Sequence, residues 1–164
     1  MEEITVVDEN DNTIGYKERG KIKPDDIYRV SALWIKNSRG DVLLAKRALT
    51  KKNDPGKWGP SVAGTVGNGE SYEENIVREA EEELGLKGIK PVKGPKVRTY
   101  GKHNFFCQWF ILTIDKKISE FRIQKEEVDR VKWFSKEELI KMLESNPEYF
   151  LNDMKKYVEL FKDE

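Results

Sequence analysis

Three glutamates, Glu79, Glu82 and Glu83, are the residues of this chain whose type and spacing best suit chemistry. On a helix, residues three and four apart are neighbours, so the three carboxylates would lie on one face and repel one another. A hard cation such as Mg²⁺, which prefers carboxylate and water oxygens as ligands, would offset that repulsion. The competing interpretation is a solvated helix face, the usual setting of glutamates on a helix.

The segment that carries these glutamates is predicted to be a helix that begins at Ser71 or Tyr72. Ser71 and Glu74 form a capping-box pattern. Gly85 follows Leu84, where a left-handed residue would end the helix. An apolar stripe at three- and four-residue spacing comprises Ile76, Val77, Ala80 and Leu84. The glutamates are therefore expected on a different face from the packed one.

The spacing of the whole segment is more informative than the glutamates alone. It runs Gly64, five residues, Glu70, seven residues, Arg78-Glu79-Ala80, one residue, Glu82-Glu83, one residue and Gly85-Leu86. This pattern resembles the Nudix box at every specified position. The resemblance implies the Nudix fold, an α/β architecture in which a mixed β-sheet is sandwiched between α-helices. It also implies Mg²⁺-dependent cleavage of the diphosphate bond of a nucleoside diphosphate linked to another moiety, with Mn²⁺ as an alternative cofactor.

The same resemblance implies roles for individual residues. The expected metal ligands are Glu79, Glu82, Glu83 and the backbone carbonyl of Gly64. Arg78 is expected to orient the carboxylates, because it can pair with Glu82 one turn further on, and Glu70 is expected to hold the loop. The sequence leaves the general base undecided: it could be a carboxylate of the box helix, or Glu126 or Glu127 ahead of the strand 128–134. Glu127 is our candidate outside the helix. For Glu126 and Glu127 the competing interpretation is a solvated turn.

The composition fits one domain, residues 1–164, without a dominant charge. The 30 basic and 30 acidic residues cancel, so no overall field favours nucleic acid or a membrane as partner. A single cysteine excludes an intramolecular disulfide and fits a reducing compartment. No apolar run approaches the ~20 residues of a membrane span. We therefore expect a soluble, cytoplasmic protein that acts on a small-molecule diphosphate, and homodimers are common in families of this kind.

Strand and turn signals predict the elements that position the helix. The expected strands are 4–7 and 14–16, which form an N-terminal β-hairpin, and 28–35, 41–47, 97–100, 105–114 and 128–134. Pro91 and Pro95 are expected to break the chain after the Nudix-box helix. Two further helices are expected at 135–143 and 147–161, the second with Tyr149 on its packed side. This order of elements predicts a mixed sheet with helices on both faces.

A basic loop is expected over residues 48–58, shortly before the Nudix box. Phosphate oxygens could be held by Lys46, Arg47, Lys51 and Lys52, by Arg47 bidentately. The competing interpretation is that these side chains only solubilise the loop. Trp58 offers a ring on which a base could stack, although aromatic residues at strand positions more often belong to the core.

A second resemblance covers roughly the first half of the chain. Residues 8–15 and several positions within residues 47–64 resemble the isopentenyl diphosphate isomerase branch of the Nudix superfamily. That branch has a catalytic cysteine where this chain has Ala63, and metal-binding histidines where it has Thr65 and Tyr28. Without the thiol and imidazoles the isomerase's proton-transfer machinery is absent, which favours an isomerase-like hydrolase. A non-catalytic nucleotide sensor is the third alternative, but a sensor would be expected to have lost box carboxylates.

Overall fold

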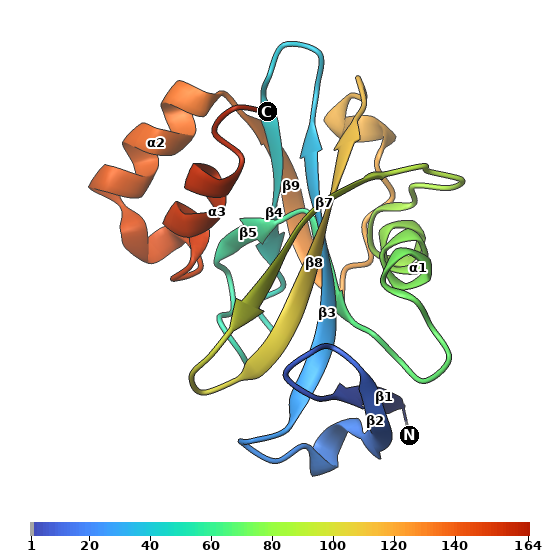
Figure 1. The fold of residues 1–164 in the computed structure, drawn as a ribbon. Coiled ribbons are helices and arrows are strands. Elements are labelled where there is room, and N and C mark those ends of the chain that lie inside the picture. Colours follow the sequence, from blue (N-terminus) through green and yellow to red (C-terminus); the bar gives the residue numbers. More distant parts are fainter. Residues whose placement is uncertain (1) are drawn as a thin grey trace.

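The computed structural model describes residues 2–164, and in them a nine-stranded mixed sheet forms the centre of the molecule (Figure 1). The strands are β1 (Glu3–Val7), β2 (Thr13–Glu18), β3 (Ile27–Lys36), β4 (Val42–Arg47), β5 (Trp58–Pro60), β6 (Val62–Thr65), β7 (Val92–Thr99), β8 (Asn104–Thr113) and β9 (Val128–Phe134). The helices are α1 (Tyr72–Leu84), α2 (Lys136–Ser145) and α3 (Met154–Leu160), with 3-10 turns η1 (Arg19–Lys21), η2 (Ile118–Glu120) and η3 (Pro147–Tyr149). The N-terminal hairpin, β1 with β2, is confirmed.

β3 is the strand to which most of the sheet is joined. It pairs in parallel with β8, beginning with Ile27 opposite Asn104, and antiparallel with β1, β4 and β6. β8 also pairs with β7, and β4 pairs with β5 and β9. The mixed sheet is therefore confirmed. Within the β3–β6 pair, Gly64 lies opposite Ser31, which ties the first residue of the Nudix-box segment to the centre of the sheet.

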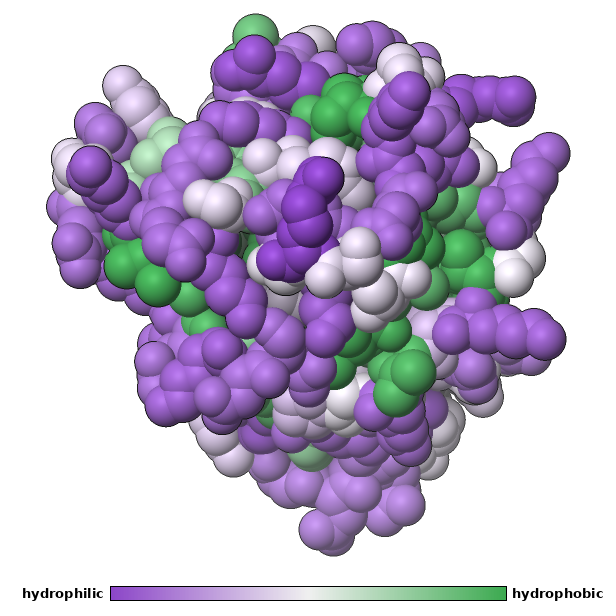
Figure 2. Space-filling view, turned by 90° about the horizontal axis from the view of Figure 1, so that it is seen from above, coloured by the Kyte–Doolittle hydropathy of each residue, from purple (hydrophilic) through white to green (hydrophobic). Residues whose placement is uncertain are grey.

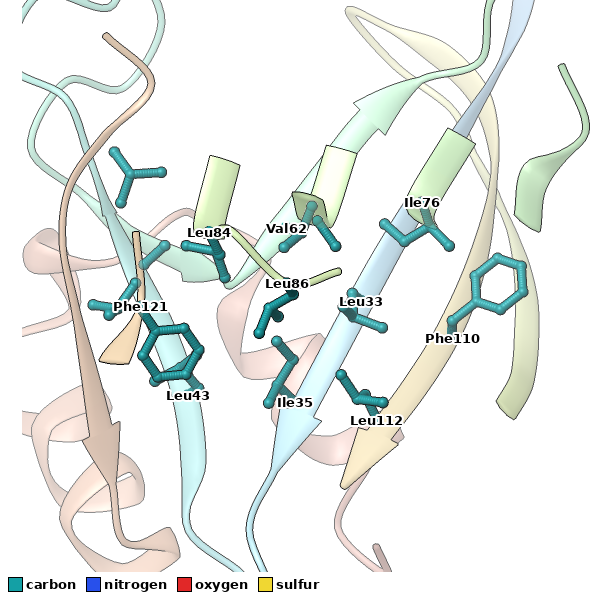
Figure 3. Close-up of a cluster of buried hydrophobic side chains, with 14 residues drawn as sticks. Leu33, Ile35, Leu43, Val62, Ile76, Leu84, Leu86, Phe110, Leu112 and Phe121 are labelled. Atoms are coloured by element: carbon teal, nitrogen blue, oxygen red, sulfur yellow. The ribbon is translucent and has the colours of Figure 1, made fainter. Parts of the chain in front are cut away.

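Helices cover both faces of this sheet, as predicted (Figure 1). On one face, α1 buries Ile76, Ala80 and Leu84 completely, in the cluster drawn in Figure 3. On the other face, α2 and α3 cover a second, aromatic cluster in which Trp34 stacks on Phe161 at a centroid distance of 4.7 Å. Full burial of one such side chain contributes about 1.5–3 kcal/mol, so the packing of α1 fixes its rotation about its own axis.

The limits of α1 are those that the sequence predicts. The Ser71 hydroxyl accepts a hydrogen bond from the Glu74 backbone N–H (3.1 Å), and the Glu74 carboxylate accepts one from the Ser71 N–H (2.8 Å). Gly85 ends the helix in the left-handed conformation, with φ of 69°. Because a side chain is disfavoured at that φ, glycine is the natural residue at this position.

The chain after α2 differs from the prediction of one helix over residues 147–161. It forms η3 and α3 instead, with Phe150 extended between them. Phe150 bridges to Trp58, and the Leu151 N–H donates to the Trp58 carbonyl at 3.0 Å. This pairing with β5 takes the backbone groups that a continuous helix would need. Tyr149 consequently points outward and is 52% exposed, contrary to the expectation that it packs.

β7 is longer than predicted, because Pro95 does not break it. The register between β7 and β8 shifts between Lys93 and Lys96, so Pro95 lies in an irregularity where no ladder hydrogen bond is needed. The Gln108 amide donates to the Gly94 carbonyl at 2.9 Å and holds this bulge. β7 pairs with β8 on one side only among the described strands, and edge strands and bulges tolerate proline.

Hydrophilic residues predominate on the face shown in Figure 2, where the hydrophobic residues form small separate patches. This agrees with the 37% of charged residues in the chain. Across residues 2–164, none of the helices has both the length and the apolar character to cross a bilayer.

Asp11, at the tip of the β1–β2 hairpin, joins the hairpin to the first turn of α1. Its carboxylate accepts hydrogen bonds from Arg29 Nε (2.8 Å), Lys96 Nζ (2.6 Å) and the Tyr72 hydroxyl (3.0 Å). Burial raises the pKa of Asp11, but the hydrogen bonds from Lys96 and Arg29 outweigh it, so the pKa lies below its usual value. The ionised carboxylate is therefore stabilised in the folded protein.

We predict that Asp11→Asn lowers the free energy of unfolding at pH 7 by about 2 kcal/mol, because charged hydrogen bonds are lost. A lowered folded-state pKa contributes stability above the unfolded value of about 3.9, so the difference should shrink as the pH falls below about 4. Urea denaturation at pH 7 and at a pH below about 4 measures this difference in the free energy of unfolding. Asp25→Asn, at an exposed position, is the control. Equal stabilities of the two variants at pH 7 would contradict the anchoring role.

Candidate active site

A cavity of about 850 Å³ between α1, β6 and the loop after β4 contains most of the residues predicted for the site. They are Arg47, Lys51, Lys52, Gly64, Arg78, Glu79, Glu82, Glu83 and Glu127. The carboxylates of the Nudix-box helix thus share one open space with Arg47, the last residue of β4, and with Lys51 in the loop after it. Trp58, which is only 7% exposed, and Lys46 instead line a different cavity.

Gly64 and Glu79 are in closest contact within this cavity. A Cβ atom built on Gly64 would lie 2.6 Å from Cγ and 2.9 Å from Oε1 of Glu79. The carboxylate therefore occupies the space in which any other residue would carry its side chain. Since Gly64 is fixed by the β3–β6 pairing and Glu79 by the packing of α1, the sheet and the helix together bring the Glu79 carboxylate up to the Gly64 backbone.

Glu83 is the most strongly perturbed carboxyl group of the cavity. Burial, followed by the neighbouring charges of Glu79 and Glu127, raises the pKa of Glu83 to about 9. Burial also raises the pKa of Glu79, against the lowering effect of Arg78. Glu79 and Glu83 thus influence each other's titration. Burial together with a neighbouring like charge favours the protonated form of a carboxyl group.

Arg78 is the cation that organises the box segment. Its guanidinium contacts the carboxylates of Glu70 (2.5 Å), Glu82 (3.0 Å) and Glu79 (3.2 Å). Glu70 also accepts from the Gly67 N–H at 2.9 Å, which is the loop-holding contact that we expected. Arg78 therefore links the loop before α1 to two of the predicted metal ligands.

Glu127 and Lys51 form an ion pair across the cavity. Both side chains are partly exposed, at 39% and 28%. Arg47 donates through Nε to the Asn53 carbonyl at 3.0 Å, and no carboxylate within residues 2–164 lies within 4.0 Å of its guanidinium. Arg47 thus retains donors for an incoming anion, whereas Lys51 would first have to leave Glu127.

The donor set of the cavity suits a hard divalent cation. Carboxylate and carbonyl oxygens are the ligands that Mg²⁺ accepts, and Gly64, Glu79, Glu82 and Glu83 supply both kinds. Within residues 2–164, however, no three acidic, histidine or cysteine side chains already converge on one ion position. Arg78 pairs with both Glu82 and Glu79. Binding an ion through all three glutamates therefore requires that these carboxylates turn from Arg78.

Residues from the N-terminal hairpin region also line the cavity, and sequence reasoning did not place them there. Arg19 of η1 and Glu2 form an ion pair at its rim, with Nε and Oε2 3.2 Å apart. Gln124, from the segment before β9, also lines the cavity, and its backbone N–H donates to the Glu83 carbonyl. No local motif marks these residues, because they reach the site only through the pairing of distant strands.

Comparison with known sequences and structures agrees with this geometry. A family model described as "NUDIX domain" matches residues 27–157. An uncharacterized Nudix hydrolase of Listeria monocytogenes is 33% identical over 159 residues, which cover 94% of each chain. An isopentenyl-diphosphate Delta-isomerase of Kocuria rhizophila is 28% identical over 158 residues, covering 91% of this chain and 86% of that enzyme.

The fold also has a counterpart among solved structures. The crystal structure of DR0079 from Deinococcus radiodurans superimposes with a TM-score of 0.81 and covers 98% of this chain and 99% of its own. The two sequences are 23% identical. The likeness extends from the N-terminal hairpin to the C-terminal helices and establishes the fold.

We predict that Gly64→Ala leaves the protein folded but weakens divalent-cation binding roughly tenfold, about 1.4 kcal/mol. The new methyl group would displace the flexible Glu79 side chain rather than the backbone. Titration calorimetry with Mg²⁺ measures the affinity, and circular dichroism the fold. Gly15→Ala is the matched control, because a Cβ there meets nothing within 4 Å. Unchanged affinity in Gly64→Ala would refute the importance of this contact.

Proposed function

The chain belongs to the Nudix hydrolase family, and we propose that it is a Mg²⁺-dependent pyrophosphohydrolase of nucleoside diphosphates linked to another moiety. One observation carries the proposal. The Nudix-box carboxylates line the same cavity as Arg47 at the end of β4 and Lys51 in the loop after it. The carboxylates suit a hard cation, and the cations suit the oxygens of a diphosphate. A substrate with two linked phosphates needs both kinds of group within one space.

In the proposed reaction, a water oxygen bonds to phosphorus, the bridging P–O bond breaks, and the second phosphate leaves with the electron pair of that bond. Glu79, Glu82, Glu83 and the carbonyl of Gly64 would hold Mg²⁺, which neutralises phosphate charge and makes a water molecule more acidic. Arg47 would donate to phosphate oxygens and orient the diphosphate. Holding the reacting groups in place in this way lowers the entropic part of the barrier.

Glu127 is our candidate for the group that takes the proton from water. Its carboxylate is bonded to Lys51 in the absence of substrate. If Lys51 turns to a phosphate oxygen, an oxygen of Glu127 becomes free to accept a proton. Phosphate binding by Lys51 and proton transfer to Glu127 are thus coupled through one ion pair. The carboxylates of α1 are the alternative base, because Glu83 lies in the same cavity.

Hydrolysis is favoured over isomerisation by the residues beside the box. Ala63 and Thr65 line the cavity where the isomerase branch has a cysteine and a histidine. Tyr28 stands where the isomerase branch has another metal-binding histidine. Its ring packs on Phe105, with 5.6 Å between the ring centroids, and does not line the cavity. The single thiol, Cys107, is buried, and burial raises its pKa to about 12. These residues offer no nucleophile or imidazole for proton transfer.

We further propose that the substrate is a small molecule and that the protein works in the cytoplasm without nucleic acid. The balanced charge and the single, buried cysteine support this view. We also propose that the chain forms a homodimer, and light scattering, which measures the molar mass in solution, tests this.

We predict Mg²⁺-dependent release of two phosphate-bearing products from at least one of three substrate groups: nucleoside polyphosphates, nucleotide sugars or dinucleotides. Glu83→Gln should lower kcat roughly 10²-fold or more, since it removes a negatively charged ligand of the proposed Mg²⁺ ion. Glu81→Gln, exposed on α1 and outside the cavity, should retain activity within about threefold.

The same assay separates the alternatives. Hydrolysis in water enriched in ¹⁸O should place the label on a phosphate product, as attack on phosphorus requires. Isomerised isopentenyl diphosphate would show that the argument from Ala63 and Thr65 is wrong. Nucleotide binding without turnover would favour a sensor and overturn the hydrolase proposal.

A further inference from the structure

A second cavity, of about 700 Å³, lies on the sheet face covered by α2, and we call it the β9 cleft. The residues that matter for its chemistry are Lys46, Trp58, Arg130, Lys132, Phe134 and Tyr149. It shares no lining residue with the 850 Å³ cavity of the Nudix-box glutamates. Figure 1 shows α2 and the box helix α1 on opposite sides of the sheet. Whatever binds in the β9 cleft therefore does so outside the proposed active site.

The strand register places cations side by side in this cleft. Lys46 on β4 lies directly opposite Arg130 on β9 and opposite Trp58 on β5. Residues opposite each other in antiparallel strands share one face, and like charges at such positions destabilise the sheet. Lys132, two residues along β9, adds a third positive charge to the same face. The sheet thus holds a row of positive charge that it would be more stable without.

Two of these three cations have no acidic partner. Lys132 pairs with Glu138 at 2.7 Å. For Lys46 and Arg130, no carboxylate of residues 2–164 lies within the 4.0 Å of an ion pair. Lys46 is half-buried. An anion bound between Lys46 and Arg130 would offset the repulsion between these two cations.

Three aromatic side chains, Trp58, Phe134 and Tyr149, also line the cleft. The Arg130 guanidinium lies over the Trp58 ring at 5.5 Å, and Lys132 lies over the Phe134 ring at 4.5 Å. Tyr149, turned outward by the break between η3 and α3, contributes an exposed ring to the lining. The volume is within the roughly 300–1,000 Å³ of small-molecule sites. Aromatic rings beside unpaired cations suit a ligand that carries both a planar apolar group and a negative charge.

We propose that the β9 cleft is a second ligand site, which binds an aromatic organic phosphate such as a nucleoside monophosphate independently of the Nudix-box cavity. The phosphate lies between Lys46 and Arg130, and the planar group lies against Tyr149. This site is separate from the proposed hydrolytic function and does not depend on it. Its occupancy is set by the concentration of the phosphate ligand.

The test is calorimetric titration of the full chain with adenosine 5′-monophosphate in the absence of divalent metal. Arg130→Ala and Lys46→Ala should each weaken binding roughly tenfold or more. Lys141→Ala, which removes an exposed cation of α2 outside the cleft, should leave the affinity within about twofold. Inorganic phosphate and adenosine, titrated separately, should each bind more weakly than the monophosphate, because each lacks half of the recognised groups.

Arg47→Ala distinguishes the two cavities, because Arg47 lines the Nudix-box cavity and does not line the β9 cleft. If the ligand occupies the β9 cleft, this variant should bind it as the wild type does. Loss of binding in Arg47→Ala but not in Arg130→Ala would place the nucleotide in the Nudix-box cavity and overturn the proposal. Absence of wild-type binding at millimolar ligand would overturn it as well. Melting curves with and without ligand show that each variant is folded.

Discussion

The repulsion between Glu79 and Glu83 is the constraint on which the rest of the site depends. Both carboxyl groups are held in one cavity by a helix whose apolar stripe is fully buried. Burial, followed by the neighbouring charges of Glu79 and Glu127, favours a proton on Glu83 and raises its pKa to about 9. A divalent cation bound there would take the place of that proton. The fold thus maintains an arrangement that is costly by itself and that a bound cation would make favourable.

Several distant contacts converge on this one arrangement. β3 fixes Gly64 through β6, and Arg78 connects the box loop to the helix through Glu70. Asp11 joins the N-terminal hairpin to the first turn of α1. Each contact removes one way in which the helix could move relative to the sheet. The glutamates therefore remain close together because these contacts and the close packing of the core fix α1 relative to the sheet.

Local patterns predicted α1 well, since its cap, its apolar stripe and its terminal glycine all lie within one segment. They could not predict the break at Phe150, which depends on pairing with Trp58 far away in the chain. For the same reason they missed Arg19 in the active-site cavity. Trp58 was expected near the glutamates because it is close to the box in sequence. Its strand register instead places it beside Lys46 on the other side of the sheet.

The most direct test of the central claim is the melting temperature of the metal-free protein with and without excess Mg²⁺. A ligand at a hundred times its dissociation constant stabilises a protein by about 2.7 kcal/mol, or roughly 5–10 °C for a chain of this size. The account predicts such a rise in the wild type and its loss in Glu83→Gln. No rise in the wild type, or an equal rise in the variant, would contradict the claim that these carboxylates are held together for a cation.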